Sequence, residues 1–245
     1  MPKFFVTDGE IRESSAILTG ANAEHIKVLR RKPGDTIIIS NGQGKDFLCE
    51  IQEIAAAGVT VSVREALTST TEPSVSCTVL AGFPKGERAD YIVQKCTELG
   101  ANEIIFFLSK RCVARPDTKS MQKKLMRFQK IAESAAKQSG RGIIPRVDAV
   151  GSLEEALDIA ALSELVLFMY ETGDRISLRE AIERKESLSS VAIITGPEGG
   201  FDPEEAQRIA ERGIQPLAMG PRILRCETAP VVVLSALMYA TDNLQ

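Results

Sequence analysis

Short apolar segments with alternating polar positions dominate the first 67 residues of the chain. They are rich in β-branched residues, and PGD and NGQG turns separate them. They cover residues 4–6, 16–20, 36–40, 46–54 and 59–67. One helical pattern interrupts them at residues 23–31, with Asn22 as its expected N-cap. The pattern predicts a small β-barrel domain over residues 1–70, and the polar run at residues 68–74 is typical of a linker.

Beyond the linker the hydrophobic period changes. Apolar segments typical of buried strands cover residues 75–83, 103–109, 165–171, 190–196 and 215–220. Helical patterns lie between them at residues 89–100, 118–138 and 152–162. Because strands and helices alternate, we expect residues 74–245 to form an α/β domain around a mostly parallel sheet.

Composition narrows the chemistry. The five cysteines form no CxxC motif, which argues against a disulfide framework and a thiolate zinc site. His25 is the only histidine, so we expect no metal site. The first ten residues lack the pattern of a secretory signal, and the longest apolar run is too short to cross a bilayer. We therefore expect a cytoplasmic protein that does not contact a membrane.

Charge is unevenly distributed along a chain whose formal net charge is −3. Residues 84–146 carry 14 basic and 6 acidic side chains, whereas residues 147–245 carry 8 and 17. A basic segment of this kind suits a phosphate backbone, which predicts RNA or DNA binding. The alternative is that the long helix at residues 118–138 simply has a solvated, lysine-rich face.

Three glycine-containing loops follow consecutive predicted strands: YETGD, GPEGGFD and GPRILR. A ligand crevice lies beyond the carboxyl ends of the strands in open α/β sheets, although any one loop alone could be only a tight turn. The helix after GPEGG begins DPEE, so Asp202 as N-cap and two glutamates serve its N–H groups and would repel a phosphate. We therefore expect a nucleoside ligand without phosphate, and S-adenosylmethionine, with its cationic sulfonium, fits that description.

Several motifs in the second domain resemble one family. LAMGPRILRCETAPVVVLSAL, ITGPEGGFDPEE, KGERADYIVQKCTELGANEI, SKRCVARP and QSGRGIIP are similar to motifs of the RsmE family, which methylates N3 of a uridine in 16S ribosomal RNA. The resemblance spans nearly the whole chain. It implies a PUA-like N-terminal barrel, a SPOUT-type domain with a C-terminal trefoil knot, an S-adenosylmethionine cofactor and a homodimer. Two positions depart from the family's usual residues, Cys226 for threonine and Pro230 for alanine, and we expect Thr228 to remain the N-cap of the last helix.

The resemblance also implies which residues hold the methyl donor. They lie in the three loops and at the ends of the strands before them. They are Met169, Tyr170, Glu171, Thr195, Gly196, Gly200, Leu217, Met219, Gly220, Ile223 and Leu224.

Methylation of uracil N3 removes its proton and places negative charge on the flanking carbonyl oxygens. Arg222 and Arg225, next to the donor loop, are expected to stabilise that charge by hydrogen bonds. Arg225 could instead form a structural ion pair with Glu227. The general base stays open between Glu98, Glu171 and Glu198, of which Glu198 is the one assigned to the catalytic set.

RNA binding is expected to involve basic residues in loops near strand ends, together with the basic patch of the first domain. The candidates are His25, Arg30, Lys85, Arg88, Arg111, Arg115, Gln138 and Arg141. The last predicted helix is apolar on nearly all sides, which favours burial between two subunits. A catalytically inactive protein that binds RNA or the ribosome on the same fold is the alternative function.

Overall fold

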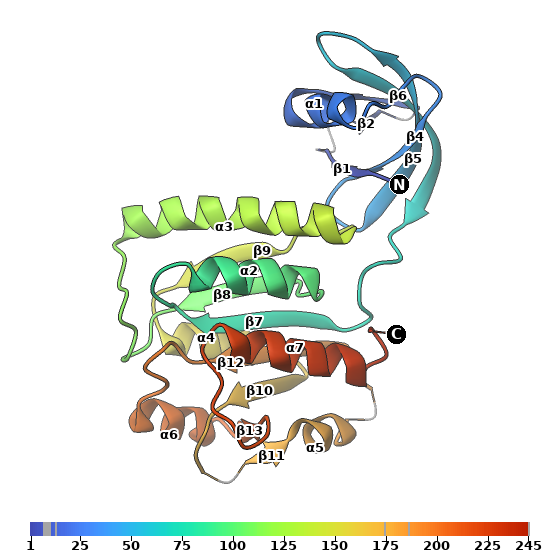
Figure 1. The fold of residues 1–245 in the computed structure, drawn as a ribbon. Coiled ribbons are helices and arrows are strands. Elements are labelled where there is room, and N and C mark those ends of the chain that lie inside the picture. Colours follow the sequence, from blue (N-terminus) through green and yellow to red (C-terminus); the bar gives the residue numbers. More distant parts are fainter. Residues whose placement is uncertain (7–10, 13, 174, 186, 245) are drawn as a thin grey trace. The chain divides into compact units, whose positions relative to one another are not determined.

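The computed structural model describes residues 1–6, 11–12, 14–173, 175–185 and 187–244. The chain divides into two compact units (Figure 1). One comprises residues 1–72 together with residues 136–144, and the other comprises residues 73–135 and 145–245. The boundary after Glu72 falls inside the expected linker, whereas the inclusion of residues 136–144 in the first unit was not anticipated from the sequence.

The larger unit is built on a sheet of seven strands in the described residues, ordered β11-β13-β10-β12-β7-β8-β9. All of its strand pairs are parallel, which confirms the predicted α/β class. The strands are β7 (Ser76–Gly82), β8 (Glu103–Phe107), β9 (Arg146–Val150), β10 (Leu165–Met169), β11 (Ile176–Ser177), β12 (Ser190–Thr195) and β13 (Pro216–Ala218). Two of them, β9 and β11, were not predicted, because β9 (RVDAV) alternates charged and apolar residues instead of forming an apolar run and β11 has only two residues.

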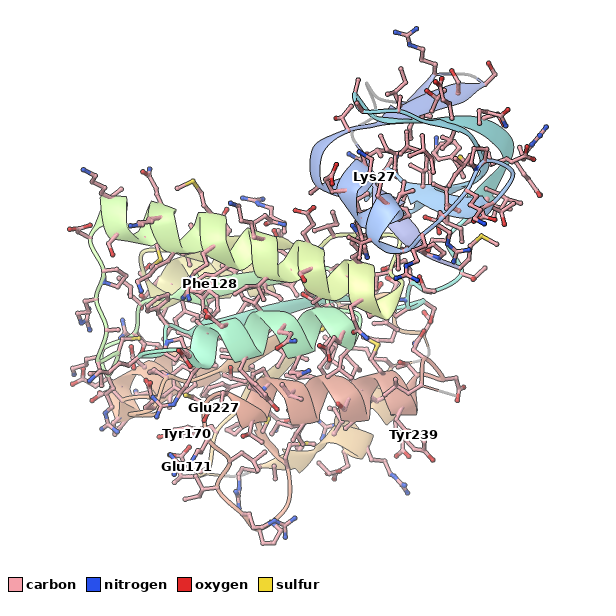
Figure 2. The ribbon with its side chains drawn as sticks, turned by 45° about the horizontal axis from the view of Figure 1, so that its top comes forward. Lys27, Phe128, Tyr170, Glu171, Glu227 and Tyr239 are labelled. Carbon is pink, nitrogen blue, oxygen red and sulfur yellow. The ribbon has the colours of Figure 1, made fainter. Side chains whose placement is uncertain are left out.

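Helices cover both faces of this sheet (Figure 1). They are α2 (Arg88–Glu98), α3 (Thr118–Ser139), α4 (Leu153–Ala160), α5 (Leu178–Glu183), α6 (Pro203–Glu211) and α7 (Thr228–Ala240). Side chains alternate along β8, so that Phe106 packs against Phe128 of α3 (Figure 2), whereas Phe107 packs against Phe201 in the loop before α6. The second of these aromatic pairs belongs to a core to which α4 and α6 contribute.

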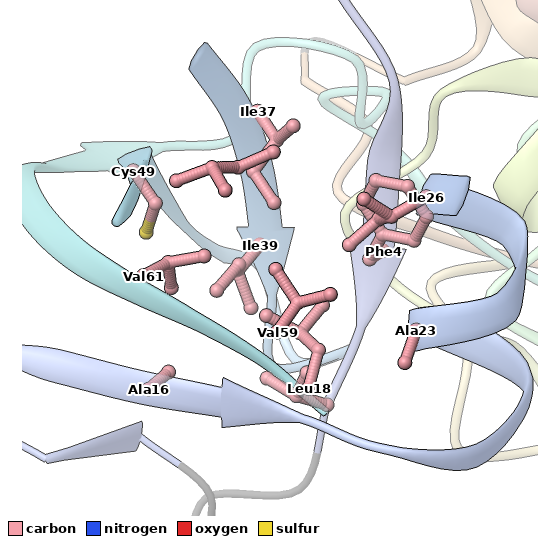
Figure 3. Close-up of a cluster of buried hydrophobic side chains, with 12 residues drawn as sticks. Phe4, Ala16, Leu18, Ala23, Ile26, Ile37, Ile39, Cys49, Val59 and Val61 are labelled. Carbon is pink, nitrogen blue, oxygen red and sulfur yellow. The ribbon is translucent and has the colours of Figure 1, made fainter. Parts of the chain in front are cut away.

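In the described residues the smaller unit contains a six-stranded sheet ordered β1-β4-β5-β6-β3-β2, the helix α1 and the last residues of α3. Its elements are β1 (Lys3–Phe5), β2 (Ile11–Arg12), β3 (Ser15–Leu18), α1 (Gly20–Val28), β4 (Thr36–Ser40), β5 (Lys45–Ile54) and β6 (Val59–Thr68). Alternate residues of the strands, with Ala23 and Ile26 of α1, form its apolar core (Figure 3). The strand pairs are antiparallel except for the parallel pair of β1 and β4.

Asn22 was predicted to cap the helix of this unit, and that prediction is wrong. The helix begins earlier, at Gly20 after Thr19, so Asn22 lies in its first turn. Its side-chain amide donates instead to the carbonyl oxygen of Phe5 at 2.7 Å. The helix therefore starts before its apolar pattern does.

Residues 136–144 join the smaller unit through a buried ion pair. The Arg141 guanidinium donates to Glu72 Oε2 at 2.6 Å, and the side chains are only 2% and 13% exposed. Glu72 Oε1 accepts the backbone N–H groups of Gly142 at 2.8 Å and Ile143 at 3.1 Å. The Ser40 hydroxyl also donates to Gly142 O. One carboxylate thus organises the whole turn after α3.

Candidate active site

The loops that follow β10, β12 and β13 line one cavity of about 820 Å³. These three strands are neighbours in the sheet, so their carboxyl ends meet at one edge, as expected from the sequence. The cavity is lined by all fourteen residues that we assigned to the donor and to catalysis. From the donor set these are Met169, Tyr170, Glu171, Thr195, Gly196, Gly200, Leu217, Met219, Gly220, Ile223 and Leu224, and from the catalytic set Glu198, Arg222 and Arg225.

The GPEGG loop is held by close backbone packing and by the start of α6. Gly200 has a φ of +66°, a conformation that side chains disfavour. Asp202 caps α6 as predicted, and Glu205 completes a reciprocal capping box. Burial raises the pKa of Asp202, but hydrogen bonds from the Glu204 N–H and from Lys110 more than offset this and hold the pKa below its usual value. The helix start is therefore anionic and its N–H groups are occupied, which leaves no phosphate site there.

The floor of the cavity is aromatic. Tyr170 stacks on Phe168 with ring centroids 5.4 Å apart, and Phe201 meets both rings edge-on. Thr195 also lines the cavity, and its hydroxyl is buried with no hydrogen-bond partner among the described residues. An apolar floor with an unsatisfied buried hydroxyl suits a ligand that has both a flat ring and polar groups.

Arg88 joins two carboxylates at the rim of the cavity. Its Nη1 donates to Glu198 Oε1 at 2.6 Å, and its Nε lies 3.4 Å from Glu227 Oε2. The hydrogen bond to Glu198 is the main reason that the pKa of Arg88 is raised. We assigned Arg88 to RNA from the sequence, but the structure makes it the link between the GPEGG loop and the segment that leads into α7.

The two carboxylates of this link are engaged to different extents. Glu198 accepts the Lys85 N–H at 2.7 Å through Oε1, the same oxygen that binds Arg88, whereas its Oε2 is buried without a hydrogen-bond partner among the described residues. Burial tends to raise the pKa of Glu227, but its own backbone N–H, the Cys226 thiol and the charges of Arg88 and Arg225 together lower it. From the sequence we considered Glu227 only as a partner for Arg225. Its position two residues after the GPRILR loop was the signal that it belongs to the site.

Arg222 and Arg225 are both exposed, and neither guanidinium group makes a hydrogen bond or an ion pair with any residue that the structure describes. The alternative ion pair between Arg225 and Glu227 is therefore not formed. Figure 2 shows Glu227, Tyr170 and Glu171 at the same end of the larger unit. Glu98, a candidate base, binds Lys95 through both oxygens at 2.9 Å and does not line the cavity.

The N-cap of α7 is Glu227, so the prediction of Thr228 is wrong. The N–H groups of Thr228 and Ala229 both donate to Arg225 O at 2.9 Å. The third helical residue is Pro230, which has no N–H. The first turn therefore needs no side-chain cap, and it offers little to an anion.

The residues that we assigned to RNA are differently placed. Lys85 is exposed on the loop before α2, and His25 and Arg30 are exposed at the end of α1. Gln138 is exposed on α3. Arg141 lies in a loop, as expected, but it is buried against Glu72.

Arg111 and Arg115 are exposed but support the protein's own loops. Arg111 lies 3.5 Å from Asp202, and Arg115 donates to Ser109 O at 2.7 Å and Lys110 O at 3.0 Å. Lys110 itself pairs with Asp202 and Glu204. Much of the basic segment seen in the sequence is thus paired in space with the acidic segment that follows it.

No group of three or more histidine, cysteine or acidic side chains is arranged to hold a metal ion in the part of the chain that the structure describes. None of the described helices combines the length and the apolar character needed to span a membrane.

Comparison with known proteins agrees with the motif resemblance. Residues 71–238 match the model of the RNA methyltransferase domain family, and residues 18–63 match that of the RNA methyltransferase PUA domain. Ribosomal RNA small subunit methyltransferase E of Bacillus subtilis is 35% identical over 253 aligned positions, covering 100% of this chain and 99% of the relative. The Mycobacterium bovis protein of the same name is 30% identical, with 93% and 87% covered.

A solved structure extends the similarity to the whole fold. The crystal structure of ribosomal RNA small subunit methyltransferase E from Neisseria gonorrhoeae, bound to S-adenosyl methionine, superposes with a TM-score of 0.84 at 30% identity and covers 98% of each chain. These matches confirm the expected SPOUT-type α/β fold with a preceding PUA-like unit. The chain belongs to the ribosomal RNA small subunit methyltransferase E family.

Proposed function

We propose that this protein transfers a methyl group from S-adenosylmethionine to N3 of a uridine in 16S ribosomal RNA. One observation carries the proposal: the cavity formed by the three strand-end loops has Arg222 and Arg225 at its edge, with no protein partner among the described residues. Family membership over the full length supports the same activity. Work on ribosomal RNA implies a cytoplasmic location.

The residues of the cavity fit the donor. The aromatic floor and the unpartnered Thr195 hydroxyl suit an adenosine, and the carboxylates of Glu171, Glu198 and Glu227 suit a cation. A bound S-adenosylmethionine supplies an electrophilic methyl group on sulfonium sulfur. The N. gonorrhoeae relative has been crystallised with this molecule.

The arginines would act on the acceptor base. Uracil N3 must pass its proton to a general base, for which Glu171 and Glu198 are the candidates that line the cavity, before its lone pair forms the new N–C bond. The electrons of the broken C–S bond remain on sulfur. The negative charge of the deprotonated ring spreads to O2 and O4, so guanidinium groups held at the edge of the cavity stabilise it. No side chain is required as a nucleophile, so we propose direct transfer without a covalent enzyme intermediate.

RNA binding would use exposed cations of both units. In the smaller unit His25, Arg30 and the polar Gln138 remain candidates. In the larger unit Lys85 and Arg115 remain candidates. Arg111 is exposed but close to Asp202, so its contribution would be weaker. Arg141 is no longer proposed, because its guanidinium is buried.

We also propose a homodimer that buries the outward face of α7. One face of this helix packs on its own unit through Val233, Leu234 and Leu237. The opposite face is apolar as well: Val231 and Val232 are half-buried and Tyr239 is 72% exposed (Figure 2). A second copy of the chain would cover it. Light scattering should give twice the chain mass, and Tyr239→Asp should shift the protein towards the monomer.

The activity can be tested with purified components. Titration calorimetry should detect S-adenosylmethionine binding, and the protein should methylate small ribosomal subunits from a strain that lacks its own enzyme of this kind. Mass mapping should place the product on N3 of one uridine. Binding of RNA without any donor binding or transfer would instead identify an inactive RNA-binding protein.

A further inference from the structure

A second cleft adjoins the donor cavity. It has a volume of about 800 Å³ and is formed by the loop before α2, the first turns of α2 and the start of α7. Arg88 and Glu227 line both spaces, so the two cavities meet at this ion pair. The remaining lining residues are Lys85, Gly86, Glu87, Tyr91 and Thr228. We refer to it below as the Tyr91 cleft.

Two side chains of the Tyr91 cleft are suited to a nucleotide. Tyr91 is 45% exposed, although aromatic residues in this unit are otherwise mostly buried. Lys85 is exposed, and its ammonium group makes no hydrogen bond or ion pair with the described residues. An exposed ring beside an available cation is the arrangement that binds single-stranded nucleic acid, where a base stacks and a phosphate pairs with the cation.

The wall that the cleft shares with the S-adenosylmethionine cavity carries a hydrogen-bond donor and a hydrogen-bond acceptor side by side. Arg88 offers N–H groups, and its Nη2 makes no hydrogen bond to the described part of the chain. Glu227 offers a carboxylate whose pKa is lowered, so it is ionised at neutral pH and can only accept. The first turn of α7 adds no N–H donor for a phosphate, because the N–H groups of Thr228 and Ala229 donate to Arg225 O and Pro230 has no N–H.

The edge of uracil complements this wall. Its N3–H is a donor flanked by the acceptors O2 and O4, so Glu227 can accept from N3–H while Arg88 donates to a carbonyl oxygen. Cytosine has an unprotonated N3 at the same place, which a carboxylate would repel. The pair therefore discriminates between the two pyrimidines as well as orienting the ring.

We propose that the target uracil binds in the Tyr91 cleft, with its ring stacked on Tyr91 and its imide edge against Arg88 and Glu227. The proposal rests on the methyltransferase function proposed above and adds the acceptor site to it. The base lies outside the helix stack in this arrangement, as enzymes that modify a base require. Glu227 then acts as a specificity-determining residue and Lys85 as a phosphate contact.

The test compares Tyr91→Ala, Tyr91→Phe and the control Gln94→Ala, which alters an exposed residue one turn along α2 outside the cleft. Transfer to small ribosomal subunits is measured over a range of RNA concentrations. Tyr91→Ala should raise the KM for RNA by about tenfold or more, whereas Tyr91→Phe restores it, since stacking on an aromatic ring contributes that much per base. The Kd for S-adenosylmethionine should stay unchanged, as should all constants of the control.

Two further variants test the edge and the phosphate contact. Lys85→Ala should lower the slope of log Kd for RNA against log salt by about one. Glu227→Gln, assayed on RNA with uridine or cytidine at the target position, should reduce the preference for uridine, because the amide no longer repels cytosine N3. Retained preference would contradict the role of Glu227.

Unchanged KM in Tyr91→Ala would overturn the site. The site would also be overturned if Tyr91→Ala made the protein monomeric and reduced its activity as much as Tyr239→Asp does. Tyr91 would then be a contact between subunits. Failure of the methyltransferase function itself looks different, because the unsubstituted protein would not bind the donor or modify RNA at all.

Discussion

Gly82, the last residue of β7, lies directly against Pro197 of the GPEGG loop. A Cβ atom on Gly82 would be 2.4 Å from Pro197 Cδ and 2.5 Å from its backbone nitrogen. Nonbonded contacts this short are essentially never made by Cβ atoms, so no residue other than glycine fits here unless the loop moves. The strand that begins the larger unit thus sets the position of a loop at the donor cavity more than a hundred residues later.

Gly82→Ala should therefore weaken donor binding without touching the donor. We expect the loop to shift, the free energy of unfolding to fall by about 1–3 kcal/mol, and the Kd for S-adenosylmethionine to rise. Calorimetric titration and urea unfolding measure the two effects. Gly151→Ala is the matched control, since its Cβ would meet only the flexible end of Glu155 at 3.2 Å. Equal affinities in both variants would contradict the proposed constraint.

The sequence predicted five of the seven described strands of the larger sheet, their parallel arrangement and the edge at which the loops gather, because buried strands and glycine loops leave a local pattern. It did not predict that Arg88 binds Glu198 and Glu227, since these residues are more than a hundred positions apart. Lys110 and Asp202 are also far apart in the sequence, so their ion pair was not predicted. The basic segment therefore suggested a more exposed positive surface than the fold presents. Long-range ion pairs follow from topology, which local patterning does not specify.

Arg222→Ala should separate chemistry from donor binding. The guanidinium has no partner among the described residues, so its removal should leave the melting temperature and the Kd for S-adenosylmethionine nearly unchanged. Loss of one donor to a developing oxyanion typically lowers kcat by about 10²–10³. Single-turnover assays with saturating RNA measure the effect, and Arg179→Ala on α5, outside the cavity, is the control. Turnover equal to that of the control would remove Arg222 from the reaction.

Glu72→Ala should destabilise the smaller unit. The substitution removes the carboxylate that Arg141 contacts at 2.6 Å and the acceptor for two backbone N–H groups. Breaking a buried ion pair typically costs about 3–5 kcal/mol, and we expect a loss of that order in urea unfolding. Glu65→Ala on the exposed side of β6 should change little. A loss no larger than that of Glu65→Ala would show that the turn at residues 140–144 does not depend on Glu72.

The five free cysteines should be unreactive while the protein is folded. All are buried, and desolvation raises the pKa of Cys49 to about 11 and those of Cys77 and Cys226 to about 12. Because the reactive form is the thiolate, Ellman's reagent at pH 8 should label the native protein only slowly. In urea the same reagent should label all five thiols. The stabilisation from these protonated thiols is fully present below about pH 9 and is lost as the pH rises towards 12. The urea midpoint should therefore fall above pH 9, whereas rapid labelling of the native protein would contradict the burial.

The basic charges that remain unpaired after folding should attract RNA through α3. Arg127 of this helix pairs with Asp90, but Lys119 and Lys123 are exposed and form no ion pair with the described residues. Such charges act over about 10 Å at 0.1 M salt, so they increase the rate of encounter rather than specify the target. Lys119→Glu with Lys123→Glu should slow association with small subunits at low salt, and the difference should shrink as salt is raised. The control is Arg179→Glu with Lys185→Glu, which changes the net charge by the same amount on α5 and just after it. If the two double variants slowed association equally, only the total charge would matter and the lysines of α3 would be ordinary solvated residues.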